Sequence, residues 1–174
     1  VYTDTGGGMT DLRLPGGAVT ETVILVYTPI ETVTVPLSHT FAHHAFELNA
    51  YRGGVLLPNF TFLSPLEITL TYTDADTAGM DEARLMLYVW NADTSAWEDA
   101  ACGTYTRAPD DNRLTVPVCQ VGVFALFEIP PPPDSPTEPT SLTIAGPVLG
   151  LTNMDYVFTA TVDAAATTPI TYTW

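Results

Sequence analysis

Two cysteines, Cys102 and Cys119, have the most definite chemistry in this chain. They lie on either side of a predicted hairpin whose tip is the run Pro109-Asp110-Asp111-Asn112, so its two strands would bring them close together. A bond between the two sulfur atoms would close this loop and stabilise the fold by about 3 kcal/mol. The sequence therefore predicts a Cys102–Cys119 disulfide, with two separate buried thiols as the alternative.

Several carboxylates gather around Gly79, and hard oxygen ligands near a glycine turn suit calcium. Counted from Asp74, however, Leu85 stands at the position where an EF-hand loop needs a glutamate that binds through both oxygens. The alternative is an ordinary turn in which Asp81 caps a short helical segment before Leu85. We therefore expect calcium to have at most a modest effect on stability. The candidate calcium ligands are Asp74, Asp76, Asp81 and Glu82.

The three histidines, His39, His43 and His44, are a second set of potential metal ligands. On a regular strand His43 and Glu47 would share a face while His44 would point to the other face. Their spacing does not match His-Glu-x-x-His or another established metal motif. We therefore assign no metal to them and interpret them as turn or edge residues that lead into a strand over Ala45–Asn49.

Aromatic side chains near one turn could bind a ligand by stacking. Trp90 and Trp97 flank the turn Asn91-Ala92-Asp93, and Tyr88 lies two residues before Trp90. Together with Tyr105, these rings could form a platform for the apolar face of a sugar. A carbohydrate-binding module is therefore one of two functions that the sequence leaves open.

Signatures of catalysis are missing from the sequence. It contains no nucleophile elbow, no P-loop and no dinucleotide-binding fingerprint. Paired carboxylates of the glycosidase type stay open, because any two of the twenty acidic residues could meet in space. We predict a protein that is not an enzyme and that needs no cofactor.

The charge of the chain restricts its partners. Five arginines and no lysine face twenty acidic residues, which gives a formal net charge of −15. Nucleic acids and anionic membranes bind through Lys and Arg, so neither is an expected partner. No apolar run is long enough to span a membrane, and Val1 does not begin a signal peptide.

Alternating side chains predict an all-β fold, an antiparallel β-sandwich. From Leu66 to Thr73 apolar and polar residues alternate regularly, as in a strand with one buried face. From Leu85 to Trp90 both faces are apolar, so we expect the second face to be covered or to form a contact surface. Further strands are predicted at Val23–Tyr27, Thr32–Leu37, Ala45–Asn49, Phe60–Leu63, Ala96–Asp99, Arg113–Cys119 and Val123–Ile129.

A proline-rich run over residues 130–139 predicts a stiff spacer, because such a segment cannot join a sheet and prefers an extended path. At roughly 3.1 Å per residue it would hold two bodies up to about 30 Å apart. Three more strands are predicted beyond it, at Ser141–Ile144, Asp155–Asp163 and Pro169–Trp174. Their apolar faces are predicted interaction surfaces, formed by Tyr156, Phe158, Val162, Ile170, Tyr172 and Trp174.

Two resemblances arise at these residues. The runs Tyr156-Val157-Phe158-Thr159-Ala160-Thr161-Val162 and Pro169-Ile170-Thr171-Tyr172-Thr173-Trp174 resemble the opening of a PKD-like or immunoglobulin-like repeat of bacterial surface proteins. The runs Leu12-Arg13-Leu14-Pro15-Gly16-Gly17-Ala18-Val19, Phe62-Leu63-Ser64-Pro65-Leu66-Glu67-Ile68-Thr69-Leu70 and Leu87-Tyr88-Val89-Trp90-Asn91 are similar to ZU5-type β-sandwiches. That family has a Pro-Pro-Gly-Ala corner motif near its start, and this chain has Gly16 in place of the second proline. Both resemblances imply interaction or scaffold modules without catalytic residues.

The predicted chain therefore has four parts: an N-terminal extended arm (1–11), a β-sandwich domain (12–129), a proline-rich linker (130–139) and an incomplete immunoglobulin-like or PKD-like unit (140–174). The glycines in the run Gly6-Gly7-Gly8 suit a flexible arm, so Val1–Thr10 is a candidate donor strand that could complete the second unit of another copy. Deleting this arm is expected to leave the sandwich folded.

These features predict a structural subunit of an extracellular or cell-surface assembly, such as a stalk, fibre or adhesin. Two explanations of the incomplete second unit stay open: the native chain continues past Trp174, or another copy completes the unit by strand complementation and the chain polymerises. Its expected partners are other copies of itself or neighbouring surface-protein modules. The alternative function is ligand recognition by a carbohydrate-binding module of a secreted protein.

Overall fold

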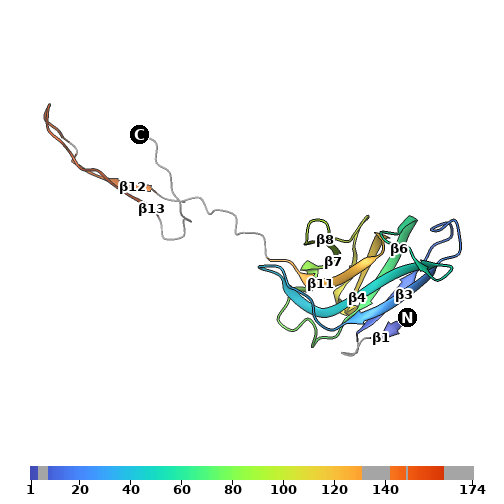
Figure 1. Ribbon diagram of the computed structural model, residues 1–174. Helices are drawn as coiled ribbons and strands as arrows, with labels where there is room; N and C mark the ends of the chain where they lie inside the picture. The colour runs from blue at the N-terminus through green and yellow to red at the C-terminus, as the bar shows by residue number, and fades with distance from the viewer. Residues whose placement is uncertain (4–7, 131–141, 148, 163–174) are drawn as a thin grey trace. The chain divides into compact units, whose positions relative to one another are not determined.

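The structure is a computed structural model that describes residues 1–3, 8–130, 142–147 and 149–162, and it confirms the all-β fold class (Figure 1). The chain divides into two compact units, residues 1–130 and 131–174. The first unit is a sandwich of two antiparallel sheets. The described part of the chain contains no helix with the length and apolarity needed to span a membrane.

The two sheets of the sandwich have the strand orders β1-β2-β6-β10-β9 and β3-β4-β11-β7-β8, and β5 also pairs with β4. The first sheet consists of β1 (Tyr2–Thr3), β2 (Met9–Arg13), β6 (Thr61–Thr71), β10 (Arg113–Gln120) and β9 (Thr106–Ala108). The second consists of β3 (Ile24–Ile30), β4 (Thr40–Arg52), β11 (Gly122–Glu128), β7 (Leu85–Asn91), β8 (Ala96–Asp99) and β5 (Val55–Leu56).

Apolar side chains from the facing surfaces of the two sheets form the core. Leu66, Ile68 and Leu70 of β6 are fully buried, which confirms the alternation predicted for this strand. Phe46 and Phe124 stack on the inner face of the second sheet, with 5.2 Å between their ring centroids. The inward face of β7 is buried in the same core, as the sequence predicts.

A bulge in β4 places His44 in the core. The register between β4 and β11 shifts in this region, and His43 has a left-handed backbone with φ 50°. As a result His44 is buried while His43 is exposed. The prediction that the histidines precede the strand is therefore wrong for these two residues, because β4 begins at Thr40.

The outer face of the second sheet carries a separate apolar cluster, which a loop covers. This loop, residues 31–39, includes the strand predicted at Thr32–Leu37, and that prediction is wrong. The loop packs Val33 onto the sheet, and the indole nitrogen of Trp97 donates a hydrogen bond of 2.8 Å to Thr34 O. The cluster consists of Ala45, Ala125 and Phe127, with Ile30, Val33, Phe41, Tyr88 and Trp97 packed against it.

The N-terminal segment belongs to the sandwich. Strand β2 pairs with β6, and Tyr2 stacks on Tyr27 with 4.4 Å between ring centroids. Thr10 is fully buried, and its hydroxyl oxygen lies 2.8 Å from His44 Nε2 and 3.0 Å from Tyr27 Oη. The predicted arm over residues 1–11 is therefore wrong at residues 2–3, which pair with β2, and at residues 9–11, and deletion of Val1–Thr10 should destabilise the sandwich.

Replacing Thr10 with valine should lower the free energy of unfolding by about 1–2 kcal/mol, because the shape is kept while a buried hydrogen-bonding group is lost. Urea unfolding followed by circular dichroism measures this change. Thr28→Val, at an exposed position of β3, is the matched control and should change stability by less than about 0.5 kcal/mol. Equal effects of the two substitutions would contradict the buried placement of Thr10.

Two side chains, from Tyr105 and Arg107, contact the first part of β7, which does not pair with β8. Arg107 donates a hydrogen bond of 3.1 Å to Leu85 O. The hydroxyl of Tyr105 lies 3.1 Å from Leu87 O and 2.5 Å from Asp99 Oδ1, so two acceptors share its single proton. Arg107 thus occupies a backbone carbonyl that another strand could otherwise pair with, whereas Leu87 O also accepts a hydrogen bond of 3.0 Å from Ala100 N.

Stability should fall at alkaline pH. Burial, and then the hydrogen bond to Asp99, raises the pKa of Tyr105; burial, and then the hydrogen bond to Glu82, raises the pKa of Tyr72. In the unfolded chain both tyrosines lose a proton near pH 10, whereas in the folded protein they keep it to higher pH. The free energy of unfolding is therefore unaffected by these two groups below about pH 10, and above it falls by up to about 1.4 kcal/mol per pH unit for each tyrosine. Urea unfolding between pH 9 and about 11.5 tests this slope. Tyr105→Phe should make it shallower, and an unchanged slope would contradict the assignment.

The described part of the second unit is a hairpin of β12 (Leu142–Ala145) and β13 (Thr159–Val162). The ring of Phe158 lies against Gly146, where a Cβ atom would stand 2.2 Å from Cδ1 of the ring, and Tyr156 lies against Gly150. Both aromatic residues are exposed. A side chain larger than that of glycine at position 146 would displace Phe158.

Several predictions fall on residues that the structure does not describe. The linker over residues 130–139 lies outside the described residues except for Pro130. The strand predicted at Pro169–Trp174 also lies outside them, together with its residues Ile170, Tyr172 and Trp174, as does the side chain of Val162.

Candidate functional site

The strongest candidate site is a groove on the outer face of the second sheet, beside the β7–β8 hairpin. It has a volume of about 440 Å³ and is called the aromatic groove below. Three of the four aromatic residues of the platform expected from the sequence, Tyr88, Trp90 and Trp97, line this space, whereas Tyr105 does not. The complete lining is Thr34, Pro36, His39, Tyr88, Trp90, Ser95, Ala96 and Trp97.

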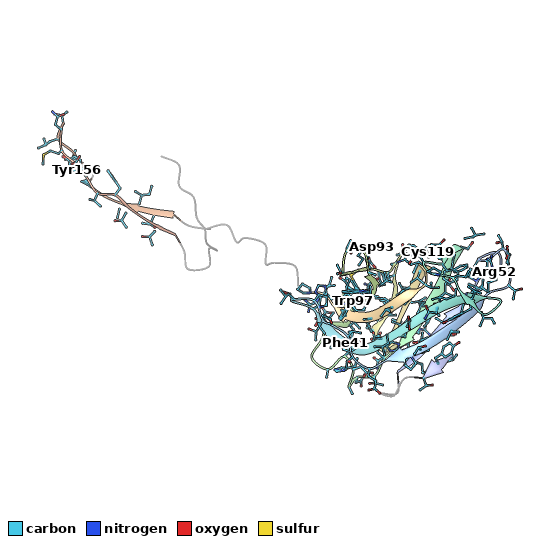
Figure 2. All side chains as sticks on the ribbon, in the orientation of Figure 1. Phe41, Arg52, Asp93, Trp97, Cys119 and Tyr156 are labelled. Carbon is cyan, nitrogen blue, oxygen red and sulfur yellow. A yellow bond between two sulfur atoms is a disulfide. The ribbon has the colours of Figure 1, made fainter. Side chains whose placement is uncertain are left out.

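Strand pairing and packing fix the two tryptophans. Trp90 and Trp97 stand directly opposite each other in the pairing of β7 with β8, and their rings meet edge to face with 5.4 Å between centroids. Trp97 also packs on Phe127, with 5.3 Å between ring centroids, and its indole N–H is held by Thr34 O. Figure 2 shows Trp97 and Phe41 at the same end of the sandwich. The walls of the groove are therefore held in place by their own packing.

Polar groups accompany the aromatic rings. His39 Nε2 lies 3.3 Å from Tyr88 Oη, and His39 Nδ1 lies 3.1 Å from Leu37 O. Burial, and then the charge of Asp99, raises the pKa of Tyr88 above its ordinary value near 10. Flat rings beside hydroxyl and imidazole groups suit a ligand that has both apolar faces and hydroxyl groups.

Sequence reasoning missed the wall of the groove that the 31–39 loop provides. Thr34 and Pro36 fall in the strand predicted at Thr32–Leu37, and His39 was interpreted as a turn or edge residue. Pro36 was the available signal, because proline cannot donate to a strand ladder. No signal in the sequence indicates that His39 meets Tyr88.

The structure does not bring the calcium candidates together around an ion. Each of their carboxylates accepts a hydrogen bond from a different group, and Asp81 caps the short 3₁₀ helix Glu82–Arg84, as the alternative interpretation of this segment predicts. Within the ranges that the structure describes, no three His, Cys, Asp or Glu side chains gather to hold a metal. The donors are Asn112 Nδ2 to Asp74, Thr73 N and Oγ1 to Asp76, Ala83 N to Asp81, and Tyr72 Oη to Glu82.

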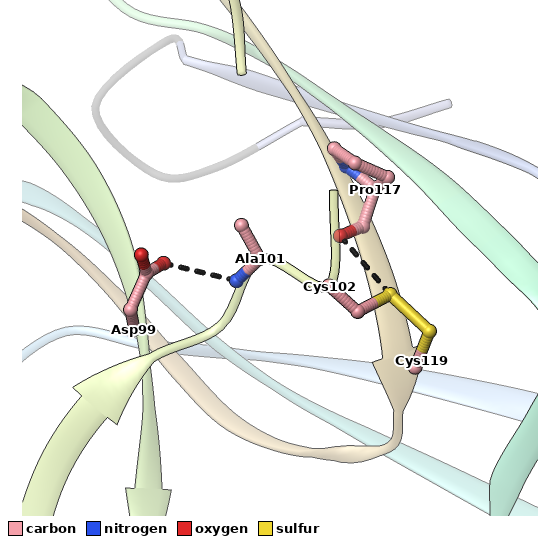
Figure 3. Close-up of a disulfide and its surroundings, with 5 residues drawn as sticks. All are labelled: Asp99, Ala101, Cys102, Pro117 and Cys119. Carbon is pink, nitrogen blue, oxygen red and sulfur yellow. Dashed lines mark hydrogen bonds between the residues drawn. A yellow bond between two sulfur atoms is a disulfide. The ribbon is translucent and has the colours of Figure 1, made fainter. Parts of the chain in front are cut away.

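The Cys102–Cys119 disulfide is confirmed (Figure 3). The Cα atoms of the two cysteines are 5.9 Å apart. Cys102 N donates a hydrogen bond of 2.9 Å to Pro117 O, and Ala101 pairs with Val118 in an isolated bridge. Only three residues of β10 pair with β9. Ala101 and Cys102, which precede β9 in the chain, cover the next part of the β10 edge. The bond fastens this covering segment to the strand.

No protein-family model, curated protein or solved structure matches this chain.

Proposed function

We propose that this chain is a non-enzymatic module of an extracellular surface assembly, such as a stalk, fibre or adhesin. The observation that carries the proposal is a sandwich closed by the Cys102–Cys119 disulfide, because disulfides form and persist outside the reducing cytosol. The acidic, lysine-free composition and the proline-rich run over residues 130–139 support a soluble module joined to others in series. Its partners are neighbouring surface-protein modules or other copies of itself.

The sequence runs that resemble ZU5-type and PKD-like modules are consistent with the same proposed function. Donor-strand exchange through Val1–Thr10 is less favoured, because β2 contains Met9 and Thr10 and lies within its own sheet. Association through the second unit, at exposed residues such as Tyr156 and Phe158, is the route that we favour.

Immunogold electron microscopy of intact producing cells tests the location. Antibodies raised against the sandwich should label the outer surface and any appendages on it. Labelling that requires permeabilised cells, or free thiols at both cysteines in protein taken from its native source, would overturn the proposal.

As a second function, we propose that the aromatic groove binds a carbohydrate. The observation that favours this function is that Trp90, Trp97 and Tyr88 surround one space, with the hydroxyl-bearing residues Thr34 and Ser95 on its lining. A glycan array probed with the whole chain tests it. Trp90→Ala should abolish the signal, because it removes a ring from the groove, whereas Arg13→Ala on the opposite sheet should not.

A further inference from the structure

A tight turn fixes the position of His39 at the aromatic groove. His39 N donates a hydrogen bond of 3.2 Å to Pro36 O, and Ser38, just before His39, has a left-handed backbone with φ 67°. This is the geometry of a type II turn, whose third residue needs a positive φ. The imidazole ring packs edge to face on Tyr88 and Phe127, with 5.4 Å and 6.1 Å between ring centroids. Both the backbone and the ring of His39 are therefore held in place.

The partners of the two ring nitrogens decide which nitrogen of the neutral imidazole carries the hydrogen. His39 Nδ1 lies 3.1 Å from Leu37 O, and a backbone carbonyl can only accept, so Nδ1 carries the hydrogen. His39 Nε2 then has only a lone pair to offer, and it lies 3.3 Å from Tyr88 Oη. The Tyr88 hydroxyl is therefore the donor in this hydrogen bond, and His39 is the acceptor.

The other acceptor beside Tyr88 already has partners of its own. Asp99 stands opposite Tyr88 in the pairing of β7 with β8. Its Oδ1 lies 2.5 Å from Tyr105 Oη and accepts a hydrogen bond of 3.0 Å from Ala101 N. Among the described residues, Tyr88 has a hydrogen bond to His39 and none to Asp99. A tyrosine hydroxyl has one hydrogen, so with that hydrogen on His39 the Tyr88 oxygen offers the groove only its lone pairs.

We infer that Tyr88 is a specificity-determining residue of the aromatic groove, in which its oxygen, oriented by His39, accepts a hydrogen bond from a ligand hydroxyl. The inference rests on the carbohydrate function proposed for this groove, and it narrows the ligand to sugars with a free hydroxyl group beside Tyr88. An ether or ester oxygen at that place brings no hydrogen, and it would leave two acceptors facing each other in a partly buried site. His39 acts through Tyr88 as a positioning residue.

An array of neutral oligosaccharides, each printed unmodified and fully O-methylated, tests the inference with the whole chain at about pH 8, where histidine is ordinarily neutral. The wild type should prefer the unmodified form of a bound sugar by about tenfold, as one neutral hydrogen bond allows. Tyr88→Phe keeps the ring and removes the acceptor, so it should lose this preference. Arg13→Ala, on the opposite sheet, is the surface control and should keep it.

Replacing His39 with leucine tests its positioning role. Without Nε2 as an acceptor, the Tyr88 hydrogen can turn toward the groove and bond to an ether oxygen, so the preference for unmodified sugars should be lost. In the Tyr88→Phe background, His39→Leu should change the preference no further, because it acts through the hydroxyl that is already missing. A nitrogen NMR spectrum of His39 in the unliganded chain should show the hydrogen on Nδ1.

The outcomes separate the acceptor role of Tyr88 from the carbohydrate function. Equal binding of unmodified and methylated sugars by the wild type, or an unchanged preference in Tyr88→Phe, would overturn the acceptor role while a sugar still bound in the groove. A hydrogen on Nε2 of His39 would overturn the orientation of Tyr88. If the wild type bound no sugar on the array, the carbohydrate function and this inference would both fall. Thermal melting of each variant establishes that a lost preference does not come from unfolding.

Discussion

Replacing Arg84 with methionine is expected to lower the free energy of unfolding by about 3 kcal/mol, the largest effect that we expect from a single charged side chain. Arg84 pairs with Glu128, and only 25% and 11% of the two side chains are exposed. Glu128 also accepts a hydrogen bond of 3.0 Å from Asp81 N. Without the guanidinium group, a buried carboxylate would keep that single backbone donor, and an unpaired buried charge is costly.

Urea unfolding of Arg84→Met, Glu128→Gln and the double variant measures this coupling. The double variant should lose less stability than the sum of the two single variants, because it leaves no unpaired charge. Arg13→Met is the matched control: Arg13 pairs with Glu67 at 3.1 Å, but 81% of its side chain is exposed, so a loss below about 1 kcal/mol is expected. A similar loss for Arg13→Met and Arg84→Met would contradict the role of burial.

This ion pair also fixes the point at which the chain leaves the sandwich. Glu128 is the last residue of β11, and Ile129 N donates a hydrogen bond of 3.2 Å to Arg84 O. Asp81 caps the short helix Glu82–Arg84 with its side chain, and its backbone N–H donates a hydrogen bond to Glu128, which connects the same turn to the end of β11. A module in a series of modules needs such an anchor, since any force carried by the chain enters the sandwich here.

The strands of the sandwich could be predicted from the sequence wherever one face of a strand is buried and the other is exposed to solvent. The run Leu66–Thr73 alternates without a break, and its inward residues are buried as predicted. The strand predicted at Ala45–Asn49 lies within β4, but the pattern failed over residues 40–44, where the bulge at His43 changes which residues face the core. A bulge follows from the pairing of β4 with β11, a contact between distant parts of the chain that local alternation does not contain.

The candidate site could be predicted only in part, for a related reason. Trp90 and Trp97 flank a short turn, so local pairing is enough to bring them together. The wall formed by Pro36 and His39 comes from a loop far away in sequence. Its position depends on packing over a second apolar cluster, and the sequence indicated only that this face needed a cover.

Loss of the disulfide is the other change with a large expected effect: Cys102→Ser/Cys119→Ser should lower the free energy of unfolding by about 3 kcal/mol. The two cysteines are 17 residues apart, so the bond restricts a loop of moderate length in the unfolded chain. In the folded protein it also holds Ala101 and Cys102 along the edge of β10, where Cys102 N donates a hydrogen bond to Pro117 O. Both contributions disappear together when the bond is removed.

Peptide mapping and unfolding together test this prediction. Trypsin can cut only after arginine in this lysine-free chain, and Arg107 and Arg113 lie between the two cysteines. Without reduction, the peptide Leu85–Arg107 should therefore remain linked to the peptide that begins at Leu114, and reduction should separate them. The wild-type chain should lose the same stability under a reducing agent as the double serine variant loses without one. If reduction left the urea midpoint of the wild type unchanged, the bond would contribute nothing to stability, and the closure of the sandwich would rest on Tyr105 and Arg107 instead.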